Sequence, residues 1–254
     1  MALLKKMPEP SEADPVADAR ELARVLNARF AGAKAEHVIA YVVREGFVGH
    51  VGAVSSFGAE SAVLLHLIST VDAKTPILFL DTGKHFGETL DYRDQLVDAF
   101  KLEDVRSILP LETKLTVDDP DGELHKVSTD RCCAIRKVEP MARAVIPFDA
   151  WFTGRKRFQA ATRTELPLFE AVGHRLRINP LAGWSEDDVA DYQERNALPE
   201  HPLIPYGYFS VGCAPCTEPS PPEDQRGGRW KGQAKIECGI HLGGLEASLT
   251  DSSL

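Results

Sequence analysis

Five cysteines form two close pairs and one isolated residue, and the pairs have the chemistry of a metal site. The pairs are Cys132-Cys133 and Cys213-x-x-Cys216. Four thiolates converging from two segments complete a tetrahedral ligand set, for which zinc and an iron–sulfur cluster are both candidates. Adjacent helical residues diverge by about 100°, which suits the spread-out iron atoms of a cubane better than one zinc ion. The alternatives are unrelated buried thiols, or a redox dithiol at Cys213 and Cys216.

The fifth cysteine, Cys238, stands between Glu237 and Gly239, with His241 three places on. A lone thiolate on a mobile tail suits a nucleophile that meets one partner inside a pocket and another outside it. A spare thiol in a frayed terminus is the alternative. In a reducing compartment, five cysteines are typical of metal ligands or redox residues and not of a disulfide framework.

Two turns at expected strand ends have the composition of nucleotide-binding loops. The first, residues 55–61, places Ser55, Ser56, Phe57 and Gly58 between an expected strand and helix, where backbone N–H groups can approach an anion. It resembles the loop of ATP pyrophosphatases, although an ordinary strand-to-helix turn has the same pattern. In the second, Asp81 could hold a ribose hydroxyl or cap the next helix, and Thr82 follows it.

Basic residues gather in a few places although the net charge is −9. In an acidic chain such clusters predict an anion site, although any single cluster is more often a solvated face. The clusters are Arg131, Arg136 and Lys137 around the first cysteine pair; Arg155, Lys156, Arg157 and Arg163; Arg226 and Arg229; and Lys231 and Lys235.

The hydrophobic pattern predicts alternating strands and helices. Helices are expected over 15–30, 35–46, 62–68, 86–100 and 130–145, with a further one after Ser185. Strands are expected over 48–55, 76–80, 105–109, 150–153 and 176–178, with a turn-rich excursion over 111–127. This alternation predicts an α/β fold with a doubly wound, mostly parallel sheet, which binds ligands at the carboxyl ends of its strands.

Composition and the positions of Pro- and Gly-rich stretches suggest how the chain is divided. Residues 1–34 are expected to form an N-terminal helical extension, 35–216 a nucleotide-binding α/β domain with the metal site, and 217–254 a flexible segment carrying Cys238. The Pro- and Gly-rich stretch 217–229 predicts a hinge. The negative charge argues against nucleic acid as the main partner. No apolar run reaches membrane-spanning or signal-peptide length, so a cytoplasmic protein without a membrane partner is expected.

Taken together, these motifs resemble bacterial assimilatory adenylyl-sulfate (APS) reductase, of the PAPS/APS reductase family, over roughly residues 30–245. The resemblance implies an adenine nucleotide alpha-hydrolase-like fold and a [4Fe–4S] cluster on Cys132, Cys133, Cys213 and Cys216. PAPS reductases share the tail cysteine but lack the other four, so APS is the implied substrate. Two departures, Ser61 where the family often has aspartate and Phe158 in a usually polar stretch, leave some substrate contacts open.

The resemblance also implies a reaction, in which Cys238 attacks the sulfur of APS, expels AMP and becomes an S-sulfocysteine. Thioredoxin then releases sulfite, as a step of sulfate assimilation and cysteine biosynthesis. No thioredoxin-like domain follows residue 241, so a separate donor protein is expected. Lys137, Arg226, Arg229 and His241 are expected to screen the approaching charges, with Arg155 a weaker candidate. Homo-oligomerisation is compatible with the pattern.

Three rival functions remain open from the sequence. A PAPS reductase would differ only in its substrate. An ATP-pyrophosphatase-type enzyme, such as a sulfurylase subunit or a tRNA-thiolating enzyme, explains the nucleotide loop but not Cys238. A non-catalytic iron–sulfur or zinc regulator leaves both strand-end loops without a role.

Overall fold

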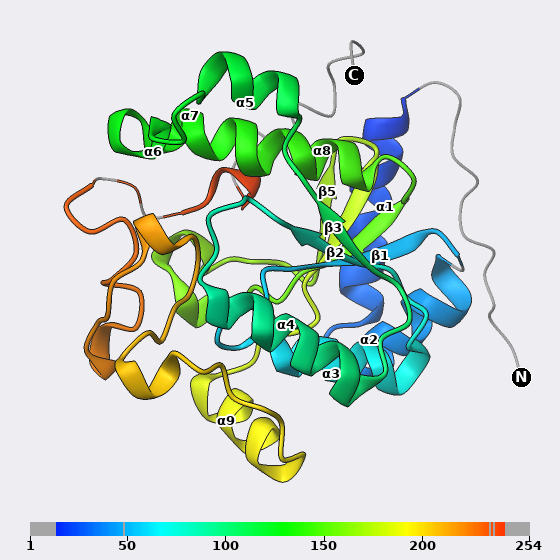
Figure 1. Cartoon of the computed structure of the whole chain (residues 1–254). Helices are drawn as coiled ribbons and strands as arrows, with labels where there is room; N and C mark the ends of the chain where they lie inside the picture. Colours follow the sequence, from blue (N-terminus) through cyan, green and yellow to red (C-terminus); the bar gives the residue numbers. More distant parts are fainter. Residues whose placement is uncertain (1–13, 48, 234, 236, 242–254) are drawn as a thin grey trace, which may run out of the picture.

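A six-stranded sheet lies at the centre of the computed structural model, which describes residues 14–47, 49–233, 235 and 237–241 (Figure 1). The strand order is β3-β2-β1-β4-β6-β5, and only the β5–β6 pair is antiparallel. The strands are β1 (Val51–Ser55), β2 (Ile77–Leu80), β3 (Val105–Ile108), β4 (Ala150–Phe152), β5 (Phe169–Val172) and β6 (Arg175–Ile178). The predicted doubly wound, mostly parallel sheet is therefore confirmed.

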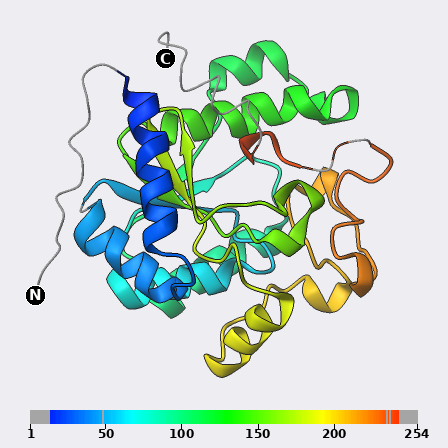
Figure 2. The same cartoon turned by 180° about the vertical axis from the view of Figure 1, so that it is seen from behind.

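Helices cover both faces of the sheet, as Figures 1 and 2 show. The larger hydrophobic core lies between one face and the helices α1 (Pro15–Arg29), α2 (Ala35–Tyr41), α3 (Ser61–Asp72), α4 (Gly87–Phe100) and α9 (Glu186–Arg195). On the other face, α8 (Glu139–Val145) packs Met141, Ala142 and Val145 against Leu78 and Trp151. Strands buried on both faces explain why β2 is a continuous apolar run.

The strand order places a topological switch point at β1. Its two neighbours, β2 and β4, lie on opposite sides of it. The chain therefore continues from β1 to β2 on one side and later adds β4 on the other side. In open α/β sheets a crevice forms outside the carboxyl ends of strands at such a point. The loops after β1 and β4 are therefore the expected walls of a binding site.

The observed secondary structure differs from the expectation in several details. The turn-rich excursion forms α5 (Glu112–Asp118) and α6 (Leu124–Val127), and β5 was not predicted. The helix expected over 130–145 consists of α7 (Thr129–Cys133), a π-helical turn (Ala134–Val138) and α8. Pro140 lies in the first turn of α8 and has no N–H to donate, which favours a break in the regular helical ladder just before it.

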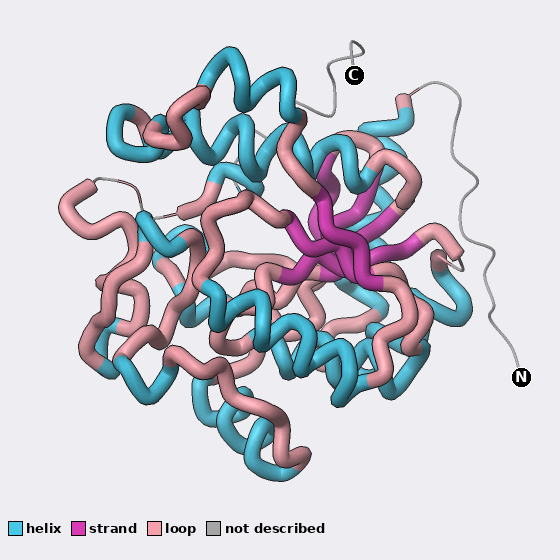
Figure 3. The backbone as a smooth tube through the Cα atoms, in the orientation of Figure 1, coloured by secondary structure: helices cyan, strands magenta, loops and turns pink. Residues whose placement is uncertain are grey.

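The described parts of both flanking segments lie against the central domain, as the backbone trace shows (Figure 3). Helix α1 buries Ala19, Ala23 and Leu26 in the larger core and lies along β5. In the predicted hinge, Thr217 pairs with Arg229 in a β-bridge. The mobility of the hinge and the three-part division of the chain stay predictions. No helix within the described ranges is long and apolar enough to cross a membrane.

Candidate active site

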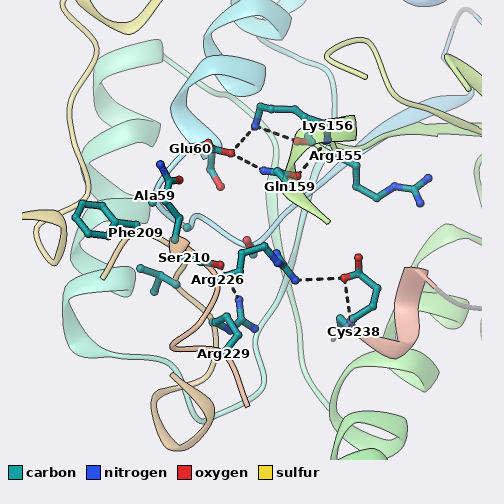
Figure 4. Close-up of a pocket in the computed structure, with 18 of the residues that line it drawn as sticks. Ala59, Glu60, Arg155, Lys156, Gln159, Phe209, Ser210, Arg226, Arg229 and Cys238 are labelled. Carbon is teal, nitrogen blue, oxygen red and sulfur yellow. Dashed lines mark hydrogen bonds and ion pairs between the residues drawn. The ribbon is translucent and has the colours of Figure 1, made fainter. Parts of the chain in front are cut away.

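A cavity of about 440 Å³ opens at the carboxyl ends of β1 and β4 (Figure 4). Several separate segments of the chain line it. Its polar lining includes Ser55, Ser56, Glu60, Ser61, Lys137, Thr153, Arg155, Lys156, Gln159, Arg163, Arg226, Arg229, Glu237 and Cys238. The predicted site residues Phe57, Asp81 and Thr82 are absent from this lining, whereas the backbone-exposing Gly58 is part of it.

The loop after β1 is shaped to present backbone groups to the cavity. Phe57 has a φ of 48°, and its fully buried ring packs edge-on against Phe79, with ring centroids 5.4 Å apart. The turn is fixed because the Phe57 N–H donates to Ser55 Oγ at 3.1 Å. A Cβ on Gly58 would lie 3.1 Å from the Val211 carbonyl oxygen, so glycine fits this close approach. The loop leads directly into α3, whose N-terminus favours an anion.

The turn after β2, residues 81–83, does not line the cavity but contacts one of the paired cysteines. Asp81 accepts a hydrogen bond from the Gly83 N–H at 3.0 Å, so its carboxylate caps its own turn. Thr82 is fully buried, and its hydroxyl lies 3.3 Å from Cys213 Sγ. The contacts of these two residues are therefore structural, and the predicted ribose contact of Asp81 stays a prediction.

Glu60, Lys156 and Gln159 form one wall of the cavity, at the top of the close-up in Figure 4. Lys156 Nζ lies 2.7 Å from Glu60 Oε2, and Gln159 Nε2 donates to the same oxygen at 2.5 Å. Burial lowers the pKa of Lys156, and the Glu60 carboxylate works against that shift. Sequence reasoning placed Glu60 in the first turn and Lys156 in a basic cluster but selected neither, and it did not consider Gln159. Their separation of about a hundred positions gave no signal that they meet.

Arg155 lines the cavity from the end of β4 but is held in place by the protein. Its guanidinium donates to Asn179 Oδ1 and forms an ion pair with Glu170. Burial, together with the charge of Arg177, lowers the pKa of Arg155 to about 10. Arg177 pairs with the same Glu170 carboxylate, at 2.5 Å, so one acidic side chain balances two arginines.

Cys238 lies at the opposite side of the cavity, beside Arg226 and Arg229 (Figure 4). The structure buries its side chain, which is 8% exposed. A hydrogen bond from the Cys133 thiol, the charges of Lys137 and Arg229, and the Ile240 N–H together overcome burial and hold the pKa of Cys238 well below its ordinary value. If Cys133 is a metal-bound thiolate it has no proton to donate, but the cations and the N–H group remain. Lys137, Arg229 and the Ile240 N–H group favour a thiolate at Cys238, whereas burial opposes it.

The four paired cysteines line a second, smaller cavity, together with Lys84, His125, Arg136, Lys137 and Trp230. This convergence of Cys132, Cys133, Cys213 and Cys216 is the arrangement that a shared metal group needs. Within the described ranges, no group of three or more His, Cys, Asp or Glu side chains is arranged to hold a single metal ion. A mononuclear zinc site brings its sulfurs within about 4 Å of one another, whereas a cubane separates them further. Four thiolates around one small cavity are a donor set for either group, and the [4Fe–4S] assignment stays a prediction.

Lys137, Arg229 and Trp230 line both cavities and so form the wall between them. The Arg229 guanidinium lies 4.5 Å from the centre of the Trp230 ring, which orients it by a cation–π contact. Burial opposes the charge on Lys137, but the nearby Cys213 and Cys238 thiolates raise its pKa. Lys137 is therefore a cation held between the smaller, cysteine-lined cavity and the larger cavity.

The structure thus brings together most of the predicted site. Ser55, Ser56, Gly58, Lys137, Arg155, Arg226, Arg229 and Cys238 line one cavity, and the four paired cysteines line the next. The side chain of His241 lies outside what the structure describes. Arg163 and Glu237 were not selected from the sequence, and both lie in the cavity wall next to Cys238.

Comparison with known proteins agrees with this geometry. Residues 50–219 match the phosphoadenosine phosphosulfate reductase domain. The chain is 59% identical to adenosine 5'-phosphosulfate reductase of Mesorhizobium japonicum, over 90% of this chain and 91% of that protein. It is 56% identical to the protein of the same name from Chelativorans sp., over 91% and 95%. A crystal structure of Candida auris phosphoadenylyl-sulfate (PAPS) reductase is similar with a TM-score of 0.65 and 26% identity, covering 78% of this chain and 97% of that one.

Proposed function

This chain belongs to the phosphoadenosine phosphosulfate reductase family, and on that premise we propose that it reduces adenosine 5'-phosphosulfate to sulfite and AMP. One observation carries the proposal: a buried cysteine, Cys238, and the cations Lys137, Arg226 and Arg229 line one cavity at the carboxyl ends of β1 and β4. Two relatives that are more than half identical carry the name of this activity. We place the reaction in sulfate assimilation and cysteine biosynthesis in the cytoplasm.

In the first step, the Cys238 thiolate attacks the sulfur of APS. An S–S bond forms, the bond between sulfur and the phosphate oxygen breaks, and AMP leaves with the electron pair. Both reactants are anionic, so Lys137, Arg226 and Arg229 lower the barrier by screening their repulsion. The loop over 55–61 and the N-terminus of α3 hold the nucleotide phosphate.

In the second step, a dithiol protein such as thioredoxin supplies two electrons. Its first thiolate attacks Cys238 Sγ, which releases sulfite and leaves a mixed disulfide. Its second thiolate resolves that disulfide and returns Cys238 to its starting state. Because Cys238 is buried in the closed protein, its segment must move before the donor can reach it.

Cys132, Cys133, Cys213 and Cys216 would hold a [4Fe–4S] cluster in the smaller cavity. When bound, this group supplies a compact negative charge beside Lys137, which keeps that side chain protonated. Arg136 and Lys137 follow the first pair on the π-helical turn, and Lys137 lines both cavities. These residues position a cation and exclude water, and the electrons for reduction come from the dithiol donor.

A single-turnover experiment tests the proposal. Purified protein is mixed with ³⁵S-labelled APS and no reductant, and its intact mass is then measured. We expect one added SO₃ group on the wild-type chain and none on Cys238→Ser. Addition of thioredoxin should release the label as sulfite. An unmodified wild-type protein that retains its iron would contradict the mechanism.

Substrate choice is tested separately because one similar structure is a PAPS reductase. The four paired cysteines favour APS. We expect a higher kcat/KM for APS than for PAPS, measured with the same donor. A clear preference for PAPS would refute this assignment while leaving the chemistry at Cys238 intact, and ATP cleavage without sulfite release would favour a pyrophosphatase instead.

A further inference from the structure

We infer that Arg163 and Glu237 form a latch, a positioning pair that holds the Cys238 segment closed over the cavity. The inference rests on the proposed function for its catalytic meaning. The contacts themselves belong to the protein without any ligand, so they can be tested independently of the reaction.

The pair is geometrically strong. Arg163 Nε donates to Glu237 Oε2 at 2.7 Å, and Arg163 Nη2 donates to Oε1 at 2.9 Å. The side chains are 7% and 4% exposed. A bidentate guanidinium–carboxylate pair fixes both distance and orientation, and its removal from water limits screening by salt. The pair joins positions that are 74 residues apart, one in the cavity wall and one in the tail.

Glu237 passes this constraint directly to the nucleophile. Its Oε1 atom accepts a hydrogen bond from the Cys238 backbone N–H at 3.0 Å. The carboxylate therefore fixes the peptide that carries Cys238, and Arg163 fixes the carboxylate. A second anchor lies on the other side, where Arg177 Nη1 donates to the Ile240 carbonyl at 3.1 Å.

All three nitrogens of the Arg163 guanidinium are occupied by protein groups. Nε and Nη2 contact Glu237, and Nη1 donates to Gln159 Oε1 at 2.5 Å. Gln159 in turn donates to Glu60 in the loop after β1. A continuous set of hydrogen bonds thus runs from that loop to the Cys238 peptide. Arg163 is placed to act through Glu237 and not by direct contact with substrate.

Two further attachments of the tail involve exposed groups. Lys235 pairs with Asp130, whose side chain is 85% exposed, and Gln233 accepts from Thr129 at 2.6 Å. Exposed ion pairs contribute little, because solvent screens them and long side chains lose entropy. The Lys235–Asp130 pair therefore offers a matched control: it holds the same segment, but its carboxylate lies in solvent, whereas both partners of the latch are buried.

The two steps of the proposed reaction need opposite states of the latch. Attack on APS needs Cys238 closed over the cavity, whereas sulfite release needs it exposed to the donor. Opening separates Glu237 from Arg163 and leaves Arg163 near Arg226, which lies 3.7 Å from Glu237 in the closed state. A weaker latch should therefore slow the first step and spare or accelerate the second.

The test compares Glu237→Gln, Arg163→Gln, the double variant and the control Asp130→Asn, all with full iron content. Hydrogen exchange of a peptide spanning 235–241, without ligand, reports local opening. We expect exchange about tenfold faster in both single variants, no further increase in the double variant, and less than a twofold change in Asp130→Asn. Arg163→Lys should recover part of the protection.

Half-reactions supply the second measurement. Adduct formation from APS should slow about tenfold in both single variants, while AMP affinity changes less than twofold. Thioredoxin-driven release of sulfite from the isolated adduct should be unchanged or faster. Unchanged hydrogen exchange would overturn the latch, and so would a loss of AMP affinity in Arg163→Gln alone. If wild type forms no adduct but the exchange results hold, the proposed function fails and the latch stands.

Discussion

Arg136 donates two hydrogen bonds to one oxygen of Asp119, from Nε at 3.0 Å and from Nη2 at 2.6 Å. Its third nitrogen donates to the Thr82 carbonyl at 2.8 Å, and the Thr82 hydroxyl lies against Cys213. Arg136 follows Cys133 on the same helix. This one arginine therefore ties the helix that carries the first cysteine pair to the segment that contacts the second pair.

We predict that Asp119→Asn destabilises the protein and reduces its iron content. The side chains of Arg136 and Asp119 are 9% and 1% exposed, and breaking a buried pair costs about 3 kcal/mol or more because one charge stays unpaired. For a chain of this length, that corresponds to a fall in Tm of roughly 6 °C or more. Differential scanning calorimetry and iron analysis measure the two effects. Asp104→Asn, in an exposed pair with Arg106, should shift Tm by less than about 2 °C. Equal shifts in both variants would contradict the prediction.

The five cysteines should separate into four that retain iron and one that does not. Serine substitution at Cys132, Cys133, Cys213 or Cys216 removes a thiolate from the smaller cavity, so broad visible absorption and bound iron should be lost. Cys238→Ser removes the nucleophile from the larger cavity and should keep both signals. Absorption spectra and metal analysis decide the point. Colourless wild-type protein with stoichiometric zinc would refute the cluster.

Lys137→Gln should slow adduct formation by about 10²- to 10³-fold, because it removes a preorganised cation from the point where two anions meet. Rapid-quench measurement of the labelled adduct gives the rate. Iron content is measured first, so that a damaged cluster is not mistaken for a lost charge. Lys231→Gln, which removes an exposed cation paired with Glu218, serves as the control and should react at the wild-type rate. A normal rate in Lys137→Gln would remove this residue from the mechanism.

The contribution of Glu170 to stability should depend on pH. Burial alone would raise the pKa of this carboxyl, but Arg177 and Arg155 outweigh burial and hold it below its ordinary value. The unfolded chain then binds the proton more readily than the folded chain. The stabilisation is complete above the unfolded pKa of about 4.3 and is lost as pH falls through the folded pKa.

Glu170→Gln should therefore lower Tm at pH 7, and its difference from wild type should shrink as pH approaches 3. Glu21→Gln, in an exposed pair with Arg24, should differ little from wild type at any pH. Thermal melts across this range provide the measurement. A difference that grows on acidification would show that the sign is wrong.

Much of the fold followed from local pattern. Apolar runs with small-residue turns placed β1 and β2, and the parallel topology put their ends beside one cavity. The hairpin of β5 and β6 was missed, although Gly173, with a φ of 60°, lies between two short strands. Glycine between strands is a hairpin signal, but Glu170 within β5 obscured its apolar pattern. The π-helical turns at Val42–Gly46 and Ala134–Val138 were missed because one extra residue barely changes helical periodicity.

Site residues of a type that is rare in the chain could be predicted from the sequence, whereas those of a common type could not. Five cysteines allow few groupings, so their division between two cavities could be predicted from spacing. Arg163 and Glu237 are two among 29 basic and 38 acidic residues, and nothing local indicates that they pair. Phe57 was predicted to bind substrate because it lies in the nucleotide-binding turn. Its ring lies in the core instead, because burying a large apolar side chain lowers the free energy of the folded state.

The wall made by Lys137, Arg229 and Trp230 has a consequence for protein engineering. One layer of side chains faces the smaller, cysteine-lined cavity on one side and the nucleotide-sized cavity on the other. A substitution in it alters both chambers at once, so substrate preference cannot be redesigned there without also changing the surroundings of the thiolates. Libraries directed at new sulfonucleotides should instead vary cavity residues outside this wall and outside the Gln159–Arg163–Glu237 contacts, such as Ala59 and Phe209.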